Sequence, residues 1–540
     1  MTALRIIGGT VHDPANGIDG DVRDICVLNG RIVASLPDDA PRLDARDMVV
    51  MPGGIDIHAH VASASVNVAR RMLPEEHALD PVRAPTLVRD RDADITIPRS
   101  GTGGTVPSTF TTGYRYAGLG YTTVFDAAVA PVSARDTHAQ FDDTPIVDTG
   151  CFILMGNDAY LQRQIANGEH ERARDYVAWL LRATKGYAVK IVNPGGVELW
   201  KRNVREVASL DDPVGDPKVT PRSILETLTE AANALGLPHP VHIHCNHLGV
   251  AGNVGITLDS MRTLSGRRAH FTHLQFQSYA GERGKSWASG AKQISEYMAA
   301  HPETSGDVGQ VMFGEACTLT ADGSVEYLLH NSTGRKWTNV DIELETGCGV
   351  VPYTYREKAA VASLQWVVGL ELFLLSADPW RLVLSTDHPN GGSFMSYPQL
   401  IHLLMDRAFR DEQIKRINPK MLSGSALADG LSREYTLNEI AIITRAGPAR
   451  LLGLSAKGHL GVGADADITI YTRDADRSRM FATPRYVLKA GTLVVEEGQL
   501  RRAPQGQRHI VRPDYDPAAE RDIKEYVNRY LSVAFENYGA

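Results

Sequence analysis

The sequence is poor in cysteine, and its cysteines do not cluster. Its 540 residues contain five, scattered along the chain: Cys26, Cys151, Cys245, Cys317 and Cys348. The number is odd and no two of them form a Cys-x-x-Cys pair, so the pattern disfavours the disulfide framework of a small secreted domain. We therefore expect free thiols and a reducing, cytoplasmic compartment.

The sequence also lacks a long apolar run and an excess of positive charge. Its most apolar window, 359–377, is interrupted by Gln365 and Glu371, which favours a helix buried against a sheet over a membrane span. The first residues, MTALRIIGGTVHDP, contain no apolar core of a signal peptide. A net charge of −8 argues against nucleic acid or an anionic membrane surface as the main partner.

Lysine is scarce, because only 13 of the 56 basic residues are lysine. A lysine inside an apolar strand is therefore conspicuous, and Lys190 lies in such a strand, Ala-Val-Lys-Ile-Val at 188–192. An ammonium group buried there without compensation would be costly. Either a carboxylate pairs with Lys190, or the charge of its side chain has been changed chemically.

The stretch 51–60, MPGGIDIHAH, is the motif around which the chain is organised. In a β-strand His58 and His60 point to the same face, with Cα atoms about 6–7 Å apart. Such a pair suits two ligands of one divalent metal ion, because neutral imidazole is a common ligand of zinc. The alternative is a pair of hydrogen-bonded histidines without metal. The Pro-Gly-Gly lead-in and the short apolar strand favour the metal.

Short strands joined by glycine turns are predicted at both ends of the chain. Residues 1–52 contain Asn29-Gly30 between two β-prone runs, a strong hairpin signal, and residues 455–510 return to the same pattern. The economical interpretation is one small β-sandwich domain built from both ends. The charged residues 511–540 are expected to form a tail or an interface.

Residues 53–454, between these two parts, alternate strand and helix. Short apolar strands are predicted at 122–125, 146–154, 188–192, 240–244, 269–273 and 382–386, and helices at 172–184, 222–235 and 437–454. This alternation indicates βα units around a parallel sheet, and at this length we expect an α/β fold, a (β/α)8 barrel of the TIM type. Residues 61–118 show weak periodicity and are expected to form a long loop.

Polar side chains gather at the predicted carboxyl ends of the strands. These ends meet on one face of a parallel barrel, where catalytic residues collect. Lys190 lies within its strand, and the side chains at strand ends are His58, His60, His244, His273 and Asp387. His242 and His244 point to the same face, so either could be the ligand, and we prefer His244 because it lies nearer the strand end. Cys245 should face the other way and is not expected to be a nucleophile.

This order of residues on successive strands resembles the amidohydrolase superfamily. The chain more closely resembles the family of the A-type subunit of formylmethanofuran dehydrogenase, and equally its hydrolytic counterpart in the formyltransferase/hydrolase complex of methylotrophic bacteria. The stretches that carry this resemblance are GGIDIHAH, GYTTVFDAAVAP, VKIVNPGG, HIHCNHLG, HFTHLQFQSYA and STDHPNGG. The matches run from about residue 1 to about residue 500.

The resemblance implies a centre of two divalent metal ions, with zinc the expected metal. His58 and His60 would bind one ion, and His244 and His273 the other. Lys190, carboxylated by CO2 to N6-carboxylysine, would bridge the two ions. Asp387 would touch a metal and act as the general base. His242 would then lie behind the ligands, and the candidates for positioning the substrate are Asn193, Asn246, His388 and Asn390.

The implied reaction is hydrolysis of a formamide, N-formylmethanofuran or the related methylofuran form, to formate and the free amine in one-carbon metabolism (formaldehyde oxidation). A formyltransferase and other subunits of a hetero-oligomeric complex would be its partners. The sequence supplies no ligands for an iron–sulfur cluster or a pterin, so any redox chemistry would belong to another subunit. Three alternatives remain: the corresponding subunit of a redox dehydrogenase, a cyclic-amide hydrolase of the hydantoinase or dihydroorotase kind, and a non-catalytic scaffold, which would be expected to have lost ligands.

Overall fold

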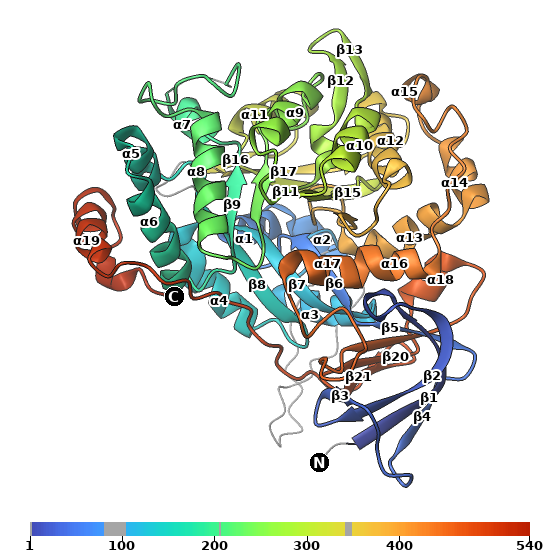
Figure 1. The fold of residues 1–540 in the computed structure, drawn as a ribbon. Coiled ribbons are helices and arrows are strands. Elements are labelled where there is room, and N and C mark those ends of the chain that lie inside the picture. Colours follow the sequence, from blue (N-terminus) through green and yellow to red (C-terminus); the bar gives the residue numbers. More distant parts are fainter. Residues whose placement is uncertain (1–2, 80–103, 203, 205–206, 341–347) are drawn as a thin grey trace.

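The computed structural model describes residues 3–79, 104–202, 204, 207–340 and 348–540. Figure 1 shows a large body covered by helices and, beside it, a smaller β domain. The blue start of the chain and a late orange-red segment lie together in this smaller domain. The two parts correspond to the predicted barrel and to the predicted domain built from both ends.

Eight parallel strands form the barrel in the described part of the chain, and they follow one another in chain order. They are β6 (Gly54–Ala59), β7 (Tyr121–Val129), β8 (Asp148–Leu154), β9 (Ala188–Val192), β10 (Val241–His244), β11 (Ala269–Phe271), β14 (Thr304–Asp307) and β18 (Leu382–Val383). The series closes, because Ala59 at the end of β6 pairs in parallel with His388, beyond β18. The TIM-type barrel predicted from the sequence is confirmed.

Strand β14 was not predicted from the sequence. Its residues, Thr-Ser-Gly-Asp, contain no large apolar side chain, although all four are buried. The other barrel strands are apolar and buried on both faces, as strands of a parallel sheet are; all five residues of β9, for example, are buried. Apolar content therefore revealed those strands and not β14.

Helices cover the outside of the barrel (Figure 1). They include α4 (Ala134–Asp142), α5 (Ala159–Asn167), α6 (His170–Ala183), α8 (Pro221–Ala234), α9 (Val254–Thr263), α10 (Ala291–Ala300), α12 (Ala360–Leu375), α13 (Tyr397–Met405), α14 (Arg407–Ile414), α16 (Leu437–Ala441) and α17 (Gly447–Leu452). The apolar window 359–377 is α12, whose Glu371 is buried and accepts a hydrogen bond from Leu427 N at 3.2 Å. None of the helices among the described residues is long and apolar enough to cross a membrane.

The smaller domain is one mixed sheet to which both ends of the chain contribute. Its strands are β1 (Ala3–Asp13), β2 (Ile18–Leu28), β3 (Arg31–Val33), β4 (Arg42–Asp44), β5 (Met48–Pro52), β19 (Ile468–Thr472), β20 (Tyr486–Lys489), β21 (Thr492–Glu496) and β22 (Gln499–Leu500). The two ends meet where β5 pairs antiparallel with β19. Ile32 N also donates to Ala464 O at 2.9 Å, so the sheet curls until β3 meets the segment before β19.

A buried cluster of charges joins this sheet to the barrel. Lys457 Nζ lies 2.8 Å from both Asp465 and Asp467, and Lys489 Nζ lies 2.7 Å from both Asp148 and Asp467. Asp148 is the first residue of β8, and Asp467 precedes β19. The lysines hold the pKa of both of these aspartates below its usual value although burial alone would raise it.

The expectation of a long loop over 61–118 is wrong for most of its described part. This segment contains α1 (Ala64–Met72), α2 (Pro74–Leu79) and α3 (Thr109–Gly118), and 80–103 lie outside the described residues. The helices are short, which left too few turns for a periodic pattern. The Asp126 carboxylate of β7 accepts hydrogen bonds from the backbone N–H groups of Val61, Ala62 and Ser63 at 2.8–3.1 Å, which fixes the start of the segment beside His60.

An insertion after β14 forms a cap, made of β15 (Gly314–Thr320), α11 (Gly323–Thr333), β16 (Thr338–Val340) and β17 (Cys348–Tyr355). Its three strands pair antiparallel, with β17 in the centre. The cap is tied to the chain beyond β18, because Cys317 N donates to Pro389 O at 3.1 Å and Tyr355 Oη donates to Asn390 O at 2.8 Å. Cap and barrel strands therefore meet at the carboxyl end of the barrel.

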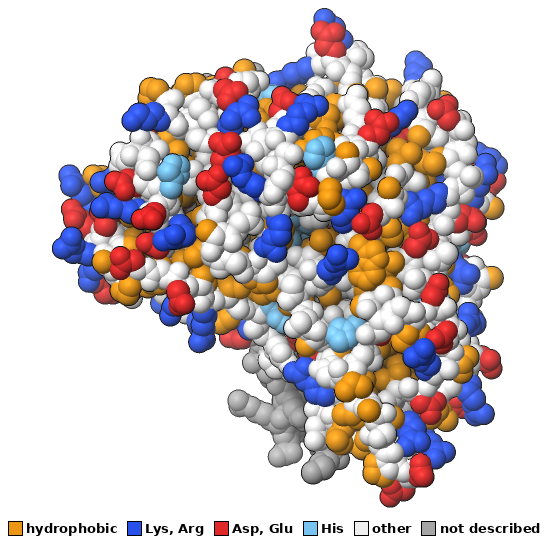
Figure 2. Space-filling model, viewed as in Figure 1, with side chains coloured by type: hydrophobic (Ala, Val, Ile, Leu, Met, Phe, Trp, Pro, Cys, Tyr) orange, Lys and Arg blue, Asp and Glu red, His pale blue; other side chains and the backbone are white. Residues whose placement is uncertain are grey.

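The final segment packs on its own barrel. Helix α19 (Ala519–Tyr530) contacts α6, and Trp179 of α6 stacks against Phe535 and Tyr538 with ring centroids 5.5 Å apart in both pairs. On the face seen in Figure 2, acidic and basic side chains are interspersed over the described residues without a continuous basic patch. This packing does not distinguish a tail from an interface, so both roles of 511–540 stay predictions.

Candidate functional site

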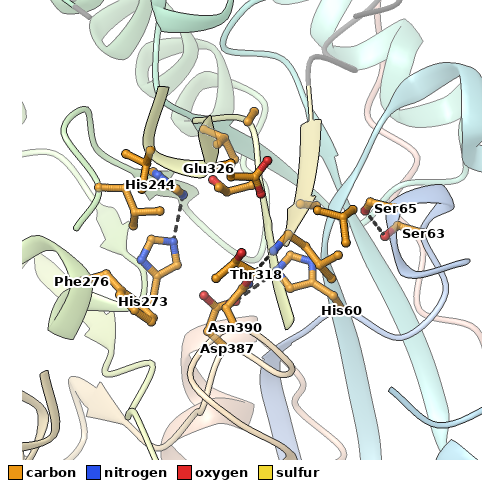
Figure 3. A pocket seen from close by; sticks show the side chains of 18 of the residues that line it. His60, Ser63, Ser65, His244, His273, Phe276, Thr318, Glu326, Asp387 and Asn390 are labelled. Atoms are coloured by element: carbon orange, nitrogen blue, oxygen red, sulfur yellow. Dashed lines mark hydrogen bonds and ion pairs between the residues drawn. The ribbon is translucent and has the colours of Figure 1, made fainter. Parts of the chain in front are cut away.

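One pocket lies at the carboxyl ends of the barrel strands, beneath the cap. The walls are largely apolar and include Leu154, Val192, Leu248, Phe276, Val350 and Tyr353. The polar floor is made by the six side chains that the sequence singled out: His58, His60, Lys190, His244, His273 and Asp387. Figure 3 shows His60 and Asp387 on one side of this floor and His244 and His273 on another.

His58, His60 and Asp387 form the first half of the floor. The two histidines come from the end of β6, and Asp387 follows β18, which is the neighbouring strand in the closed barrel. His58 Nε2 lies 2.9 Å and His60 Nε2 lies 3.0 Å from the same oxygen, Asp387 Oδ1. Burial alone would raise the pKa of Asp387, but His58 and His273 hold it well below its usual range. The three groups are close enough to hold one metal ion.

His244 and His273 form the second half. His244 is the last residue of β10, and His273 lies just beyond β11. His244 Nδ1 and His273 Nε2 face each other at 3.0 Å, with the ring planes nearly perpendicular. Nitrogen atoms at this distance can share a hydrogen bond or bind the same metal ion. Asp322 of the cap lies 2.8 Å from the other ring nitrogen of His244, Nε2.

Lys190 lies in the middle of β9 and also lines the pocket. Its side chain is 1% exposed, and its Nζ has no hydrogen-bond partner among the described residues. Burial lowers the pKa of Lys190 from 10.5 to about 7, although Asp387 and Asp307 act in the opposite direction. A buried amine without a partner is rare, because folded proteins pair their buried polar groups. Burial of Lys190 therefore favours the neutral form of its amine.

His242 lies deeper in the barrel than His244 and does not line the pocket. His239 Nε2 lies 3.0 Å from His242 Nδ1, and His242 Nε2 lies 3.0 Å from His58 Nδ1. Both ring nitrogens of His242 are thus engaged with other histidines. His242 could still form a metal-binding group with His58 and Asp307, so both groupings are geometrically available among the described residues.

Of the four candidates for positioning substrate, only Asn390 lines the pocket. Its Nδ2 donates to Asp387 Oδ1 at 2.8 Å. Asn246 Nδ2 donates to Asn193 Oδ1 at 2.8 Å and to Pro194 O at 3.0 Å, so these two asparagines hold the loops that follow β9 and β10. His388 is buried beside Phe394, and burial lowers its pKa to about 3.

Three acidic residues around the floor were not predicted from the sequence. Asp307 ends β14 and accepts hydrogen bonds from Thr272 Oγ1 at 2.7 Å and from His273 N at 3.1 Å. Asp322 and Glu326 come from the cap, and Glu326 is fully buried. Asp307 follows the same rule as Asp387, an aspartate at a strand end, but its strand was not recognised. No signal in the sequence tied the cap to the barrel.

Side chains of the pocket floor could hold a divalent metal ion. Imidazole and carboxylate groups are the usual ligands of zinc and related ions, and together with Lys190 they converge here from five different strands. Lys190 Nζ, which has no hydrogen-bond partner among the described residues, belongs to the same pocket floor. The pocket also satisfies the rule that active sites of parallel barrels lie at the carboxyl ends of the strands.

Comparisons with known proteins give full-length relatives. The pattern described as "Amidohydrolase family" matches residues 43–495. The chain is 44% identical to Protein FwdA of Methanocaldococcus jannaschii and 37% identical to the A-type subunit of the formyltransferase/hydrolase complex Fhc of Methylorubrum extorquens; each alignment covers 99% of this chain and 96% of the relative. Dihydroorotases match over only 11% of this chain, at 36–43% identity.

Solved structures agree with this relationship. The crystal structure of the FhcABCD complex from Methylorubrum extorquens with methylofuran contains a chain that matches with a TM-score of 0.91 at 36% identity, covering 100% of this chain and 96% of that one. An N-acyl-D-glutamate deacylase from Bordetella bronchiseptica shares the fold, with a TM-score of 0.52 at 14% identity, covering 94% of this chain and 99% of that one. The chain therefore belongs to the amidohydrolase family, in the group that contains Protein FwdA and the A-type Fhc subunit.

Proposed function

We propose that this protein is the hydrolytic subunit of a formyltransferase/hydrolase complex and cleaves a formamide, N-formylmethanofuran or its methylofuran form, to formate and the free amine. The observation that carries the proposal is the meeting of His58, His60, Lys190, His244, His273 and Asp387 on one pocket floor. The full-length likeness to the A-type Fhc subunit, whose complex was crystallised with methylofuran, supports the substrate.

In the proposed site His58, His60 and Asp387 would hold one divalent metal ion, and His244 and His273 would hold a second. Lys190, as N6-carboxylysine, would bind both ions through its carboxylate, and zinc suits the donor set. Bound there, the ions would supply Lewis-acid activation of water and of the formyl group. His242 supports His58 from behind, because its Nε2 lies 3.0 Å from His58 Nδ1.

Side chains of the protein transfer the proton of the attacking water. Asp387 is ionised, and Asn390 Nδ2 holds its Oδ1 at 2.8 Å. We assign Asp387 as the general base that takes a proton from the attacking water and delivers it to the departing nitrogen. The water oxygen bonds to the formyl carbon, the C–N bond breaks, and the products are formate and the amine. The apolar walls keep bulk water away from these charges, which strengthens their interactions.

In this proposal the protein works in the cytoplasm, in one-carbon metabolism, with a formyltransferase subunit that delivers the formyl group. The short dihydroorotase matches, over 11% of the chain, give a cyclic-amide substrate little support. A scaffold without activity would have no need to keep all six of the polar groups that meet on the floor.

The test is a formate-release assay on the full-length protein with any subunits that purify with it. N-formylmethanofuran should release formate without an electron acceptor, whereas dihydroorotate and hydantoin should not be opened. A strict requirement for an electron acceptor would contradict a hydrolytic subunit. Turnover of a cyclic amide, with none of the formamide, would overturn the substrate assignment.

A further inference from the structure

The cap places an acidic side chain next to Nε2 of His244, whereas Nδ1 of the same ring faces His273. Asp322 lies between β15 and α11, and its side chain is 4% exposed. Asp322 Oδ2 lies 2.8 Å from His244 Nε2 and also accepts a hydrogen bond from Thr320 Oγ1 at 2.7 Å. The carboxylate is thus buried and held from two sides.

Asp322 has an obvious local role that it does not perform. It is the N-cap residue of α11, a position where aspartate normally accepts a hydrogen bond from the backbone of the first turn. Its side chain makes no such bond. The carboxylate is directed to His244 and Thr320 instead, so its position serves the barrel site and not the helix.

The contact favours one tautomer of His244. Its Nε2 lies at ion-pair distance from Asp322, without the alignment of a full hydrogen bond. An ionised carboxylate only accepts, so it attracts a hydrogen on Nε2 and repels a lone pair there. In the neutral ring the lone pair is then on Nδ1, the atom that faces His273 Nε2 at 3.0 Å. His244 thereby presents its lone pair to the pocket floor.

We propose that Asp322 is a positioning residue that fixes the tautomer and the ring orientation of His244, and so retains the second metal ion. The inference rests on the proposed binuclear site. A carboxylate behind a metal-binding histidine orients the ring and makes the ligand nitrogen more basic.

The experiment compares the wild-type chain with Asp322→Asn and Asp322→Ala. Each protein is loaded with zinc, then challenged with a chelator, and the zinc that remains on the chain is measured over time. The same proteins are loaded with cobalt, whose visible absorption reports the ligand geometry. We expect both variants to lose one of two equivalents about 10–100-fold faster than the wild type, with a changed cobalt spectrum.

Ser324→Ala is the matched control, because Ser324 is a buried polar residue of the same cap helix and does not line the pocket. It should keep both equivalents at the wild-type rate, which separates loss of the Asp322 contact from a general effect on the cap. Far-ultraviolet circular dichroism identifies a variant that fails to fold, and Asp322→Asn preserves the volume of the side chain.

Failure of the proposed metal site and failure of the role of Asp322 give different results. A wild-type chain that binds no metal removes the proposed site itself. Two equivalents on the wild type, lost at the same rate from Asp322→Asn and Asp322→Ala, overturn the role of Asp322 and leave the proposed function standing. Faster loss in the Ser324→Ala control as well would also overturn it, since the effect would then belong to the cap as a whole.

Discussion

Replacement of Lys190 with alanine tests the bridging role of this side chain. Burial lowers the pKa of Lys190 to about 7, so about half of the amine is neutral at pH 7. For a lysine with the ordinary pKa of about 10.4 the neutral fraction is about 0.04%, so burial increases it roughly a thousandfold. Only the neutral amine can react with CO2, and the strand environment therefore favours carboxylation.

In Lys190→Ala we expect the metal pair and formate release to be lost, because no bridging oxygen atoms remain. Elemental analysis of the purified protein measures the first effect, and the formate assay measures the second. Short carboxylic acids such as acetate or propionate should restore part of both, since the truncated side chain leaves room for a carboxylate in the buried position.

Lys190→Met is the matched control. Methionine fills the same space without a charge, so this variant should also lose the metal pair but should not respond to added carboxylic acids. Its free energy of unfolding without metal should not fall below that of the wild type, because the replaced Nζ has no hydrogen-bond partner among the described residues. Normal metal content in Lys190→Ala, or equal restoration of both variants, would refute the bridging role.

Three further changes test other parts of the account. Asp387→Asn should lower formate release by about 10²–10⁴-fold with metal retained, and undiminished turnover would exclude Asp387 as the base. Asp126→Ala removes the acceptor of three backbone N–H groups and should lower the free energy of unfolding in urea by about 2–4 kcal/mol; an unchanged midpoint would contradict this. Because the folded-state pKa values of Asp148 and Asp467 are lowered, their stabilising effect should be present above about pH 4 and disappear as pH falls below it. Lys457→Met should weaken that pH dependence, and thermal unfolding at a series of pH values measures both effects.

The fold could be predicted wherever strands are apolar. Seven of the eight barrel strands carry apolar runs or the His-x-His motif, and the Asn29-Gly30 turn revealed the hairpin of the smaller domain. Strand β14 could not be found this way, since closure of the barrel buries its four small and polar residues without any apolar pattern. The short helices α1 and α3 were missed for lack of turns.

The pocket floor could be predicted because its residues lie at strand ends, and the geometry of a parallel barrel brings such ends together. The greater depth of His242 relative to His244 follows from their order along β10, but which of the two binds metal stays open, because both side chains share one face of the strand and a grouping with His242 is also available. Asp322 needed coordinates, since its approach to His244 depends on how an inserted cap folds back over the barrel.

The most direct test of the binuclear centre is an anomalous-diffraction map of crystals of the purified protein, recorded at the absorption edge of its bound metal. We predict two peaks on the pocket floor, one among His58, His60 and Asp387 and one at His244 and His273, with density for a carboxylated Lys190 between them. A peak among His58, His242 and Asp307, or a floor without metal in active protein, would contradict the account.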